Sequence, residues 1–183
     1  IVKGACLALL PVAGTLKAQE KPNIVVILAD DLASNEISCY GGKNLKTPNI
    51  DRIAEEGIRF TNNFASCAMS VPIRASLYTG LYPARHGSYQ NHKISYSDIK
   101  SVTYYLHQAG YRVGRVGKTH TVPKSVFNFE KVPGFEENCI AVTADYTVDG
   151  IRDFMRQDSP FCLFVCSTLS HAPWTCGNKD EFD

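Results

Sequence analysis

The sequence predicts an α/β fold, a mainly parallel sheet sandwiched between helices. Three observations support this class. Apolar, β-branched runs alternate along the chain with segments whose apolar residues recur at helical spacing. Charged or polar residues follow directly after three of the apolar runs, as they do at the carboxyl ends of buried parallel strands. The chain has 183 residues, of which 44% are hydrophobic, and this is enough for one core of ordinary size.

Four runs are predicted to be strands. The first, IVVILA, is continuously apolar, which is typical of a strand covered on both faces. The last, FCLFVCSTLS, carries Cys162 and Cys166 four residues apart on one face, a spacing that favours core packing over a redox pair. The predicted strands are residues 24–29, 57–65, 111–117 and 161–170.

Four segments are predicted to be helices. The first has Thr47 as its N-cap, Pro48 at its first position and Gly57 after its end. In the second, Ser70 fits an N-cap ahead of an apolar-periodic run, with Pro72 two residues later. The predicted helices are residues 47–57, a segment that starts at Ser70, residues 97–109 and residues 146–157.

Polar side chains follow three of the predicted strands. Asp30 and Asp31 follow the first strand, Lys118 and His120 the third, and His171 the last. Because the carboxyl ends of parallel strands meet at one edge of a sheet, we expect these residues to converge on one rim. Ligands of such sheets bind at this rim, so the sequence predicts a functional site there.

Charge and hydropathy exclude some classes of partner. The chain has 19 basic and 18 acidic residues and a net charge of +1, which predicts no nucleic-acid or membrane-surface binding. No stretch has the roughly 20 apolar residues that a membrane span needs. Residues 1–18, IVKGACLALLPVAGTLKA, look like a truncated secretory signal peptide cut near Ala18, which predicts export. A buried N-terminal helix is the alternative, which Pro11 and Gly14 disfavour.

Each candidate site residue also has an ordinary structural interpretation. Asp30 and Asp31 repel each other unless a cation lies between them, which favours a hard divalent ion, but one can also cap a turn while the other is solvated. Ser70 can cap its helix. The same helix start, together with Arg74 one turn along, can hold an anion.

The histidines leave similar alternatives. In an extended segment, Lys118 and His120 point to the same side and suit charge stabilisation with proton transfer. His171 can take part in the site or simply bond to backbone at a strand end. The remaining histidines are interpreted as turn, loop and helix-surface residues: His86, His92 and His107.

Five ordered motifs together resemble one family. They are NIVVILADD, TPNIDRIAEEGIRFTNNF, SVPIRASLYTGLYPARHG, GYRVGRVGKTH and SHAPW. In this order and spacing they resemble the N-terminal part of the catalytic domain of type I sulfatases, in the alkaline phosphatase superfamily. The resemblance extends from Lys21 to Asp183 and implies that residues 19–183 are an incomplete catalytic domain.

The resemblance assigns roles to the residues at the start of the site. Asp30 and Asp31 correspond to calcium ligands, with Ser70 as a further one. Ser70 also corresponds to the residue that is oxidised to formylglycine, inside a Ser-x-Pro-x-Arg motif whose Arg74 stabilises it. Cys67 lies three residues too early to be the modified residue.

The remaining roles follow from the later motifs. Lys118 and His120 correspond to residues that bind sulfate and assist the modified side chain, and His171 to one that contacts sulfate or protonates the leaving group. Further calcium ligands and a sulfate-binding lysine are expected after residue 183. Ile73, Tyr78 and Leu81 depart from the usual family pattern without breaking the minimal motif.

The resemblance also implies partners and location. A serine at the modified position implies an oxygen-independent radical maturase, typical of anaerobic bacteria, and a periplasmic or secreted enzyme. The substrate implied is a sulfated glycan, and a looser match favours the sulfamidase-like branch, which acts on N-sulfated glucosamine. Two alternatives stay open: a phosphomonoester or phosphodiester hydrolase that uses unmodified Ser70, and a non-catalytic relative that binds sulfated glycans.

Overall fold

A single parallel sheet forms the centre of the molecule. The computed structural model describes residues 21–138 and 146–172. Their four strands have the order β1-β4-β2-β3, and every neighbouring pair is parallel. The strands are β1 (Ile24–Ala29), β2 (Arg112–Gly117), β3 (Glu130–Lys131) and β4 (Phe161–Ser167). This confirms the predicted α/β class and places β4 between β1 and β2.

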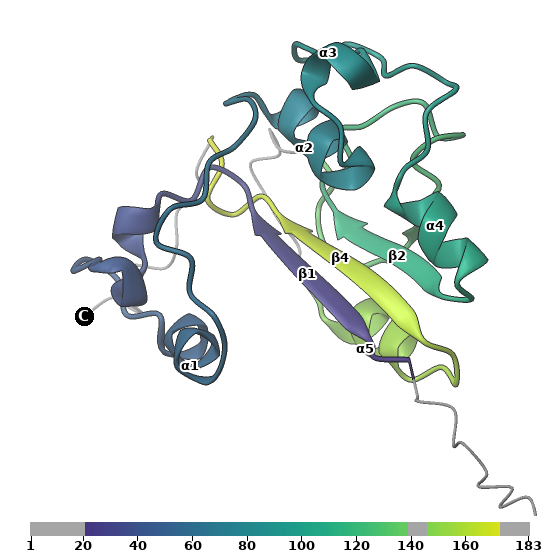
Figure 1. The fold of residues 1–183 in the computed structure, drawn as a ribbon. Helices are drawn as coiled ribbons and strands as arrows, with labels where there is room; N and C mark the ends of the chain where they lie inside the picture. Colours follow the sequence, from purple (N-terminus) through teal and green to yellow (C-terminus); the bar gives the residue numbers. More distant parts are fainter. Residues whose placement is uncertain (1–20, 139–145, 173–183) are drawn as a thin grey trace, which may run out of the picture.

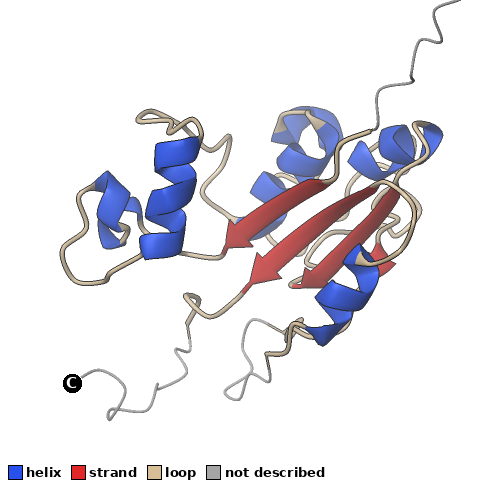
Figure 2. Ribbon diagram, turned by 90° about the horizontal axis from the view of Figure 1, so that it is seen from below, coloured by secondary structure: helices blue, strands red, loops and turns tan. Residues whose placement is uncertain are grey.

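Helices lie on both sides of the sheet. Helices α2 and α4 cover one face, and α5 lies on the opposite face (Figures 1 and 2). The helices are α1 (Pro48–Glu56), α2 (Ser70–Thr79), α3 (Pro83–His86), α4 (Val102–Gln108) and α5 (Asp149–Met155), with short 3-10 turns η1 (Ser34–Glu36) and η2 (Ser38–Tyr40). None of the described helices is long and apolar enough to cross a membrane.

The core under α2 is built around Tyr78. Its ring is fully buried and meets Phe129 and Phe164 edge to face, with ring centroids 4.9 and 5.2 Å apart. Cys162 and Cys166 of β4 lie in this same core, as predicted from their spacing. This packing anchors α2 to the sheet, and Ser70 is the first residue of that helix.

The opposite face has a smaller core beneath α5. Phe154 of α5 packs against Val116, Phe161 and Leu163 of the sheet. Gly114 of β2 is required here, because a Cβ at this position would lie 2.6 Å from the Phe154 ring. Two cores on the two faces therefore hold β2 and β4 in place, and with them the residues that follow these strands.

Strand β1 is not covered on both faces, contrary to the prediction. Its residues alternate between half-buried and exposed, and Val25 and Ile27 are 46% and 65% exposed. The reason is the place of β1 at the edge of the described sheet, where α5 covers the other face only over β4 and β2. An apolar run alone does not distinguish a covered strand from one whose second face lacks a neighbour.

The predicted strand at residues 57–65 does not form. This segment is irregular, and Ile58, Phe60 and Phe64 are at least 66% exposed. A strand needs a partner for its backbone groups, and this segment pairs with none of the four described strands.

Two predicted helices are shorter than expected. Helix α4 starts after Ser101 and α5 after Val148, so residues 97–101 and 146–148 lie outside these helices. Tyr146, predicted to start the last helix, instead shares a hydrogen bond of 2.8 Å with the Thr168 hydroxyl. The predicted signal peptide at residues 1–18 lies outside the described residues.

Candidate active site

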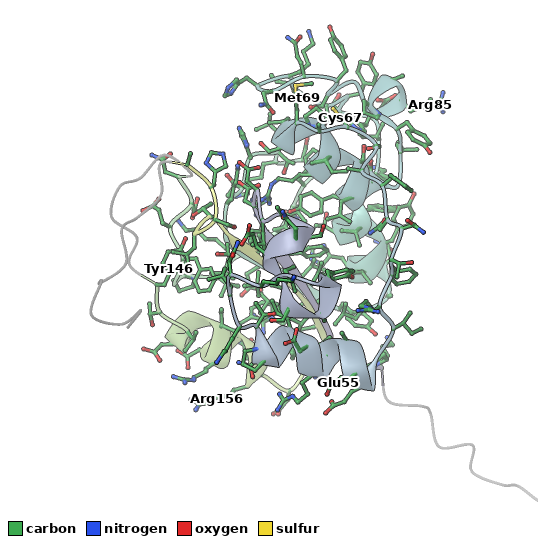
Figure 3. The ribbon with its side chains drawn as sticks, turned by 90° about the vertical axis from the view of Figure 1, so that its left-hand side faces the viewer. Glu55, Cys67, Met69, Arg85, Tyr146 and Arg156 are labelled. Atoms are coloured by element: carbon green, nitrogen blue, oxygen red, sulfur yellow. The ribbon has the colours of Figure 1, made fainter. Side chains whose placement is uncertain are left out.

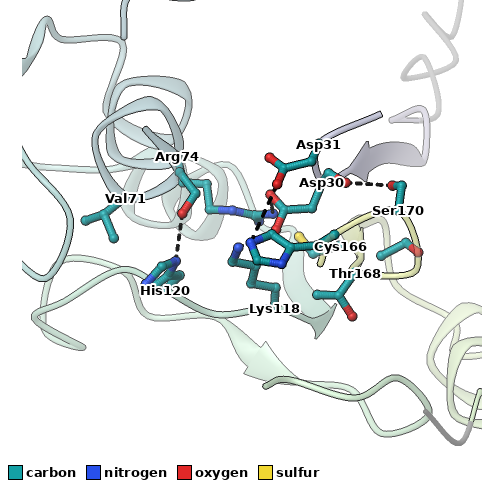
Figure 4. Close-up of polar contacts among 12 residues, drawn as sticks. Asp30, Asp31, Val71, Arg74, Lys118, His120, Cys166, Thr168 and Ser170 are labelled. Atoms are coloured by element: carbon teal, nitrogen blue, oxygen red, sulfur yellow. Dashed lines mark hydrogen bonds and ion pairs between the residues drawn. The ribbon is translucent and has the colours of Figure 1, made fainter. Parts of the chain in front are cut away.

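The carboxyl ends of β1, β2 and β4 bring the predicted residues to one rim. The backbone N–H of Asp30 donates to the carbonyl of Ser167, and that of Lys118 donates to the carbonyl of Cys166, both at 3.1 Å. These bonds extend the pairing just beyond the strands, so β4 holds both side chains next to each other. The predicted convergence of three segments is therefore observed (Figure 4).

A buried cluster of three charged side chains lies at the centre of this rim. Arg74 Nη2 is 3.2 Å from one carboxylate oxygen of Asp30, and Lys118 Nζ donates to the other. Their exposed fractions are 8% for Asp30, 4% for Arg74 and 1% for Lys118. Burial raises the pKa of Asp30, but the Lys118 hydrogen bond and the Arg74 charge outweigh it, so the pKa lies below its usual range.

The cluster has one positive charge more than it has negative charge. Arg74 Nη1 is also buried and has no hydrogen-bond partner among the residues that the structure describes. A buried cation with an unsatisfied donor is costly unless an anion or polar ligand completes it. The cluster is therefore suited to bind an anion.

Ser70 begins α2 and turns its side chain toward His120. The N-cap position belongs to Met69, so the prediction of Ser70 as N-cap is wrong. Its Oγ instead lies 2.9 Å from Nδ1 of His120, which comes from a segment 50 residues away. Because this side chain is engaged with His120, it is available for chemistry at the rim rather than folded back onto its own helix.

His120 reaches Ser70 because the chain bends after β2. Gly117 and His120 have φ angles of 80° and 46°, both left-handed, so Lys118 and His120 do not lie on one extended strand as predicted. A Cβ at Gly117 would lie 2.1 Å from the Cys166 carbonyl oxygen, so this bend requires glycine. Burial and the nearby positive charge of Lys118 hold the pKa of His120 below its usual value, which favours the neutral imidazole.

Asp31 and His171 lie at the outer side of the same rim. Asp31 has a φ of 60° and a side chain that is 62% exposed, and its carboxylate is 3.6 Å from His171 Nε2. The hydroxyl of Ser170 donates to the Asp30 carbonyl at 2.6 Å, which ties the end of β4 to that of β1. Asp30 and Asp31 thus face different partners, one buried among cations and one toward solvent.

The described donors fit a hard cation in type. Asp30 and Asp31 offer carboxylate oxygens and Ser70 a hydroxyl oxygen, and these are the ligands that calcium prefers. All three residues line one cavity of about 230 Å³, shared with Arg74 and the apolar Ile73. No cluster of three or more His, Cys, Asp or Glu side chains suited to a metal occurs within residues 21–138 and 146–172.

Sequence reasoning missed three residues around Ser70. His86 was interpreted as a turn residue, but it ends α3 and is fully buried, with Nε2 3.0 Å from Ser76 Oγ. Asn91 accepts a hydrogen bond from the Val71 N–H, and the His92 ring packs against His120. No periodicity in the sequence links His86 of α3 to α2. The contacts of Asn91 and His92 join a loop to segments that are distant along the chain, which the sequence pattern does not show either.

Known proteins are similar to this chain in fold and in sequence. An ulvan-active sulfatase of Formosa agariphila is 38% identical over 85% of the chain and 31% of its own length. The human N-sulphoglucosamine sulphohydrolase is 34% identical over 96% of the chain and 36% of its own length. The solved structure of a protein in complex with its substrate, D-glucosamine-2-N,6-O-disulfate, matches this chain with a TM-score of 0.70 and 31% sequence identity. The match covers 85% of this chain and 36% of that protein's chain.

These relatives are considerably longer than the chain. The chain spans about a third of the length of the curated relatives it matches. The family model described as Sulfatase nevertheless matches residues 22–181, almost the whole sequence. This match, over a chain with the parallel sheet described above, shows that the chain belongs to the sulfatase family.

Proposed function

We propose that this chain is the N-terminal part of a sulfatase catalytic domain, and that the full-length enzyme removes sulfate from a sulfated glycan. The observation that carries the proposal is the buried cluster of Asp30, Arg74 and Lys118, whose extra positive charge and unsatisfied Arg74 Nη1 suit a sulfate group. Ser70, at the start of α2, lies beside this cluster in the same cavity.

Some residues of this chain are proposed to bind sulfate and others to transfer protons. Arg74 and Lys118 bind sulfate oxygens, and the N-terminus of α2 adds a positive dipole at the same point. His120 is the base at position 70, because its Nδ1 is within hydrogen-bond distance of the Ser70 oxygen and its lowered pKa keeps it neutral. His171, at the outer side of the rim, is placed to protonate the leaving alcohol or amine.

Position 70 is proposed to carry formylglycine made from Ser70 by an oxygen-independent, serine-type radical maturase. A hydrated aldehyde at this position would supply one hydroxyl that displaces the alcohol or amine from sulfur, and a second hydroxyl whose deprotonation would break the C–O bond to sulfate and restore the aldehyde. The small side chain of Ser70 and its hydrogen bond to His120 fit a group of this size at this point.

Calcium is the proposed metal, held by Asp30 and Asp31 together with the oxygen at position 70. It would offset negative charge on the bound sulfate and on the nucleophile. Since calcium takes 6–8 oxygen ligands, further oxygens from the rest of the full-length enzyme or from water would complete its coordination.

The substrate class rests on relatives named for sulfated glycans. The relatives include an ulvan-active sulfatase, an N-acetylglucosamine-6-O-sulfatase and an N-sulphoglucosamine sulphohydrolase. These names favour a sulfated glycan and leave both O-sulfate and N-sulfate within the proposal. Export, to the periplasm or outside the cell, agrees with the signal-peptide pattern of residues 1–18.

Mass spectrometry of the peptide that spans Ser70 tests this mechanism. The full-length protein, coexpressed with a serine-type maturase, should show a mass loss for the conversion of Ser70 to formylglycine and should hydrolyse an aryl or glycan sulfate. An active enzyme with unmodified Ser70 would exclude this route. Such an enzyme, if it hydrolysed phosphomonoesters or phosphodiesters, would favour the alternative in which the serine itself attacks.

A further inference from the structure

One short loop contacts the residue next to Ser70 and the ring of His120. Asn91 and His92 are consecutive residues on the loop after α3; Asn91 bonds to the backbone of Val71 and His92 packs against His120. The side-chain oxygen of Asn91 accepts the Val71 N–H at 3.1 Å. The ring of His92 lies across the ring of His120, with centroids 5.7 Å apart and planes at 65°.

Asn91 replaces a missing helix cap. The first N–H groups of a helix have no partner inside the helix, and the N-cap side chain usually accepts one of them. Met69, at the N-cap of α2, makes no such bond, and Pro72 has no N–H. Asn91 therefore supplies the acceptor for the residue directly after Ser70, and this fixes where the side chain of Ser70 starts.

His92 supports His120 from the other side. Both residues have left-handed φ angles, 63° for His92 and 46° for His120, a conformation that is uncommon for non-glycine residues. Such conformations persist only where surrounding contacts hold them, and they concentrate at functional sites. The edge-to-face packing of the two rings limits how far the His120 ring can turn away from Ser70.

The loop that carries these two residues is itself anchored. Ser88 is fully buried, and its hydroxyl donates to the Lys93 carbonyl at 2.8 Å, which closes the loop. Ser95 N–H donates to the Val122 carbonyl at 3.0 Å, beyond His120 on the next segment. The loop is therefore closed on itself by Ser88 and held by Ser95 to the segment that follows β2.

We propose that Asn91 and His92 are positioning residues, which together hold the side chain at position 70 against His120 in the geometry that the reaction needs. This proposal rests on the proposed function, because it concerns the same site. Neither residue is assigned a chemical step. They act through Ser70 and His120, which move relative to each other if the loop no longer holds them.

Substitutions of Asn91 in the full-length enzyme test the first half of the proposal. Rates are measured with an aryl sulfate and divided by the formylglycine content from mass spectrometry. Asn91→Ala should lower kcat about 10- to 100-fold, as expected for a misplaced reacting group, with KM changed less than about twofold. Asn91→Asp keeps the acceptor oxygen, so kcat should recover, while its added negative charge near the sulfate should raise KM.

Gln90→Ala is the matched control, since this exposed side chain is the preceding residue of the same loop. Its kcat should stay within about twofold of the unchanged enzyme, as for a surface substitution. A kcat per formylglycine that is unchanged in Asn91→Ala, or equally low in Asn91→Ala and Asn91→Asp, would overturn the capping role. If the enzyme without any substitution has no sulfatase activity, the proposed function is wrong. Failure of the positioning proposal and failure of the proposed function are therefore distinguishable.

Substitutions of His92 test the second half and do not depend on the folding of the Asn91 variants. His92→Ala should lower kcat, and His92→Phe should restore most of it, because phenylalanine keeps a ring against His120 but cannot carry a proton. If His92→Phe is as slow as His92→Ala, the residue acts chemically and the positioning role is wrong. If His92→Ala is as fast as the unchanged enzyme, the ring contact has no role.

Discussion

Two regions of the molecule differ in how completely they are packed. Around α2, β2 and β4, side chains from distant segments are buried, and Tyr78, Leu163 and Lys118 are almost fully enclosed. Around α1 and the outer face of β1, no residue of α1 is buried and Ile27 is exposed. Figure 1 shows α1 apart from the sheet and α2, and in Figure 3 Met69, just before α2, lies near one end of the molecule and Glu55 of α1 near the other.

The difference indicates which parts of the site are complete within this chain. The charged cluster of Asp30, Arg74 and Lys118 is built from α2 and from the ends of β1 and β2, which this chain packs by itself. The apolar side chains of α1 and β1 have the composition of a core but lack a covering layer among the described residues. The proposal that the chain is about a third of a sulfatase explains this contrast, because the remaining part would cover that side.

The largest expected effect comes from removing a buried charge in the packed region. Lys118→Met in the full-length enzyme should lower kcat/KM by about 10²- to 10³-fold, since Lys118 is proposed to stabilise the sulfate charge. It should also lower the free energy of unfolding by about 3 kcal/mol, because Asp30 loses a buried partner. Sulfatase assays and urea unfolding measure the two effects.

Lys131→Met is the matched control for this prediction. The ion pair of Lys131 with Glu137 is exposed, so its loss should not change stability or activity measurably. Equal stability of Lys118→Met and Lys131→Met would show that the buried pair does not hold this region together.

The next effect concerns the exposed region. If the rest of the full-length enzyme covers the outer face of β1, Ile27→Lys should destabilise that enzyme by about 2 kcal/mol or more, as expected for a charge placed in a covered apolar site. Ile94→Lys is the control, because Ile94 is 62% exposed, close to the 65% of Ile27, but lies in a loop. Equal and small effects of both substitutions on urea unfolding would contradict the proposed covering layer.

A third effect is pH-dependent and belongs to the packed region. Burial lowers the pKa of His86, so the folded protein keeps it neutral while the unfolded chain binds a proton near the ordinary pKa. As pH falls through that value, the unfolded state takes up more protons and the free energy of unfolding decreases, by up to about 1.4 kcal/mol per pH unit. Urea unfolding of the full-length enzyme between pH 7.5 and 5.5 measures this slope.

His86→Gln isolates the contribution of His86 from that of other groups. The variant has no imidazole at this position, so its stability should fall less steeply toward acid than that of the unchanged enzyme. The same slope in both proteins would show that His86 does not set the acid sensitivity.

The sequence predicted the fold class and the rim well because both depend on local patterns. The apolar runs of β1 and β2 formed close to the predicted bounds, β4 ends at Ser167 instead of residue 170, and the polar residues after the strands met at one edge. The strand predicted at residues 57–65 does not form, because a strand needs a pairing partner and the pattern of one segment does not reveal whether a partner exists. The exposed face of β1 was missed for the same reason, since covering depends on neighbours.

The candidate site shows the same limit at the level of side chains. The strand ends placed Asp30, Lys118 and His171 at one rim, and the family resemblance added Ser70 and Arg74. Neither predicted the hydrogen bond between Ser70 and His120, which needs a bend after β2. Asn91 lies 20 residues from the N–H that it accepts. A contact of this kind follows from how a loop is anchored in three dimensions, and no local periodicity reports it.

The smallest expected effect belongs to Tyr78, in the packed region. It distinguishes the contribution of the packed ring from that of the hydroxyl contact. The Tyr78 hydroxyl lies 3.7 Å from Cys166 Sγ, a long contact to a weak acceptor, whereas the ring meets three aromatic neighbours. Tyr78→Phe keeps the ring, so the full-length enzyme should lose no more than about 1 kcal/mol in urea unfolding. Tyr78→Leu loses the aromatic contacts and should cost more. A Tyr78→Phe protein as unstable as Tyr78→Leu would mean that the hydroxyl, rather than ring packing, joins α2 to β4.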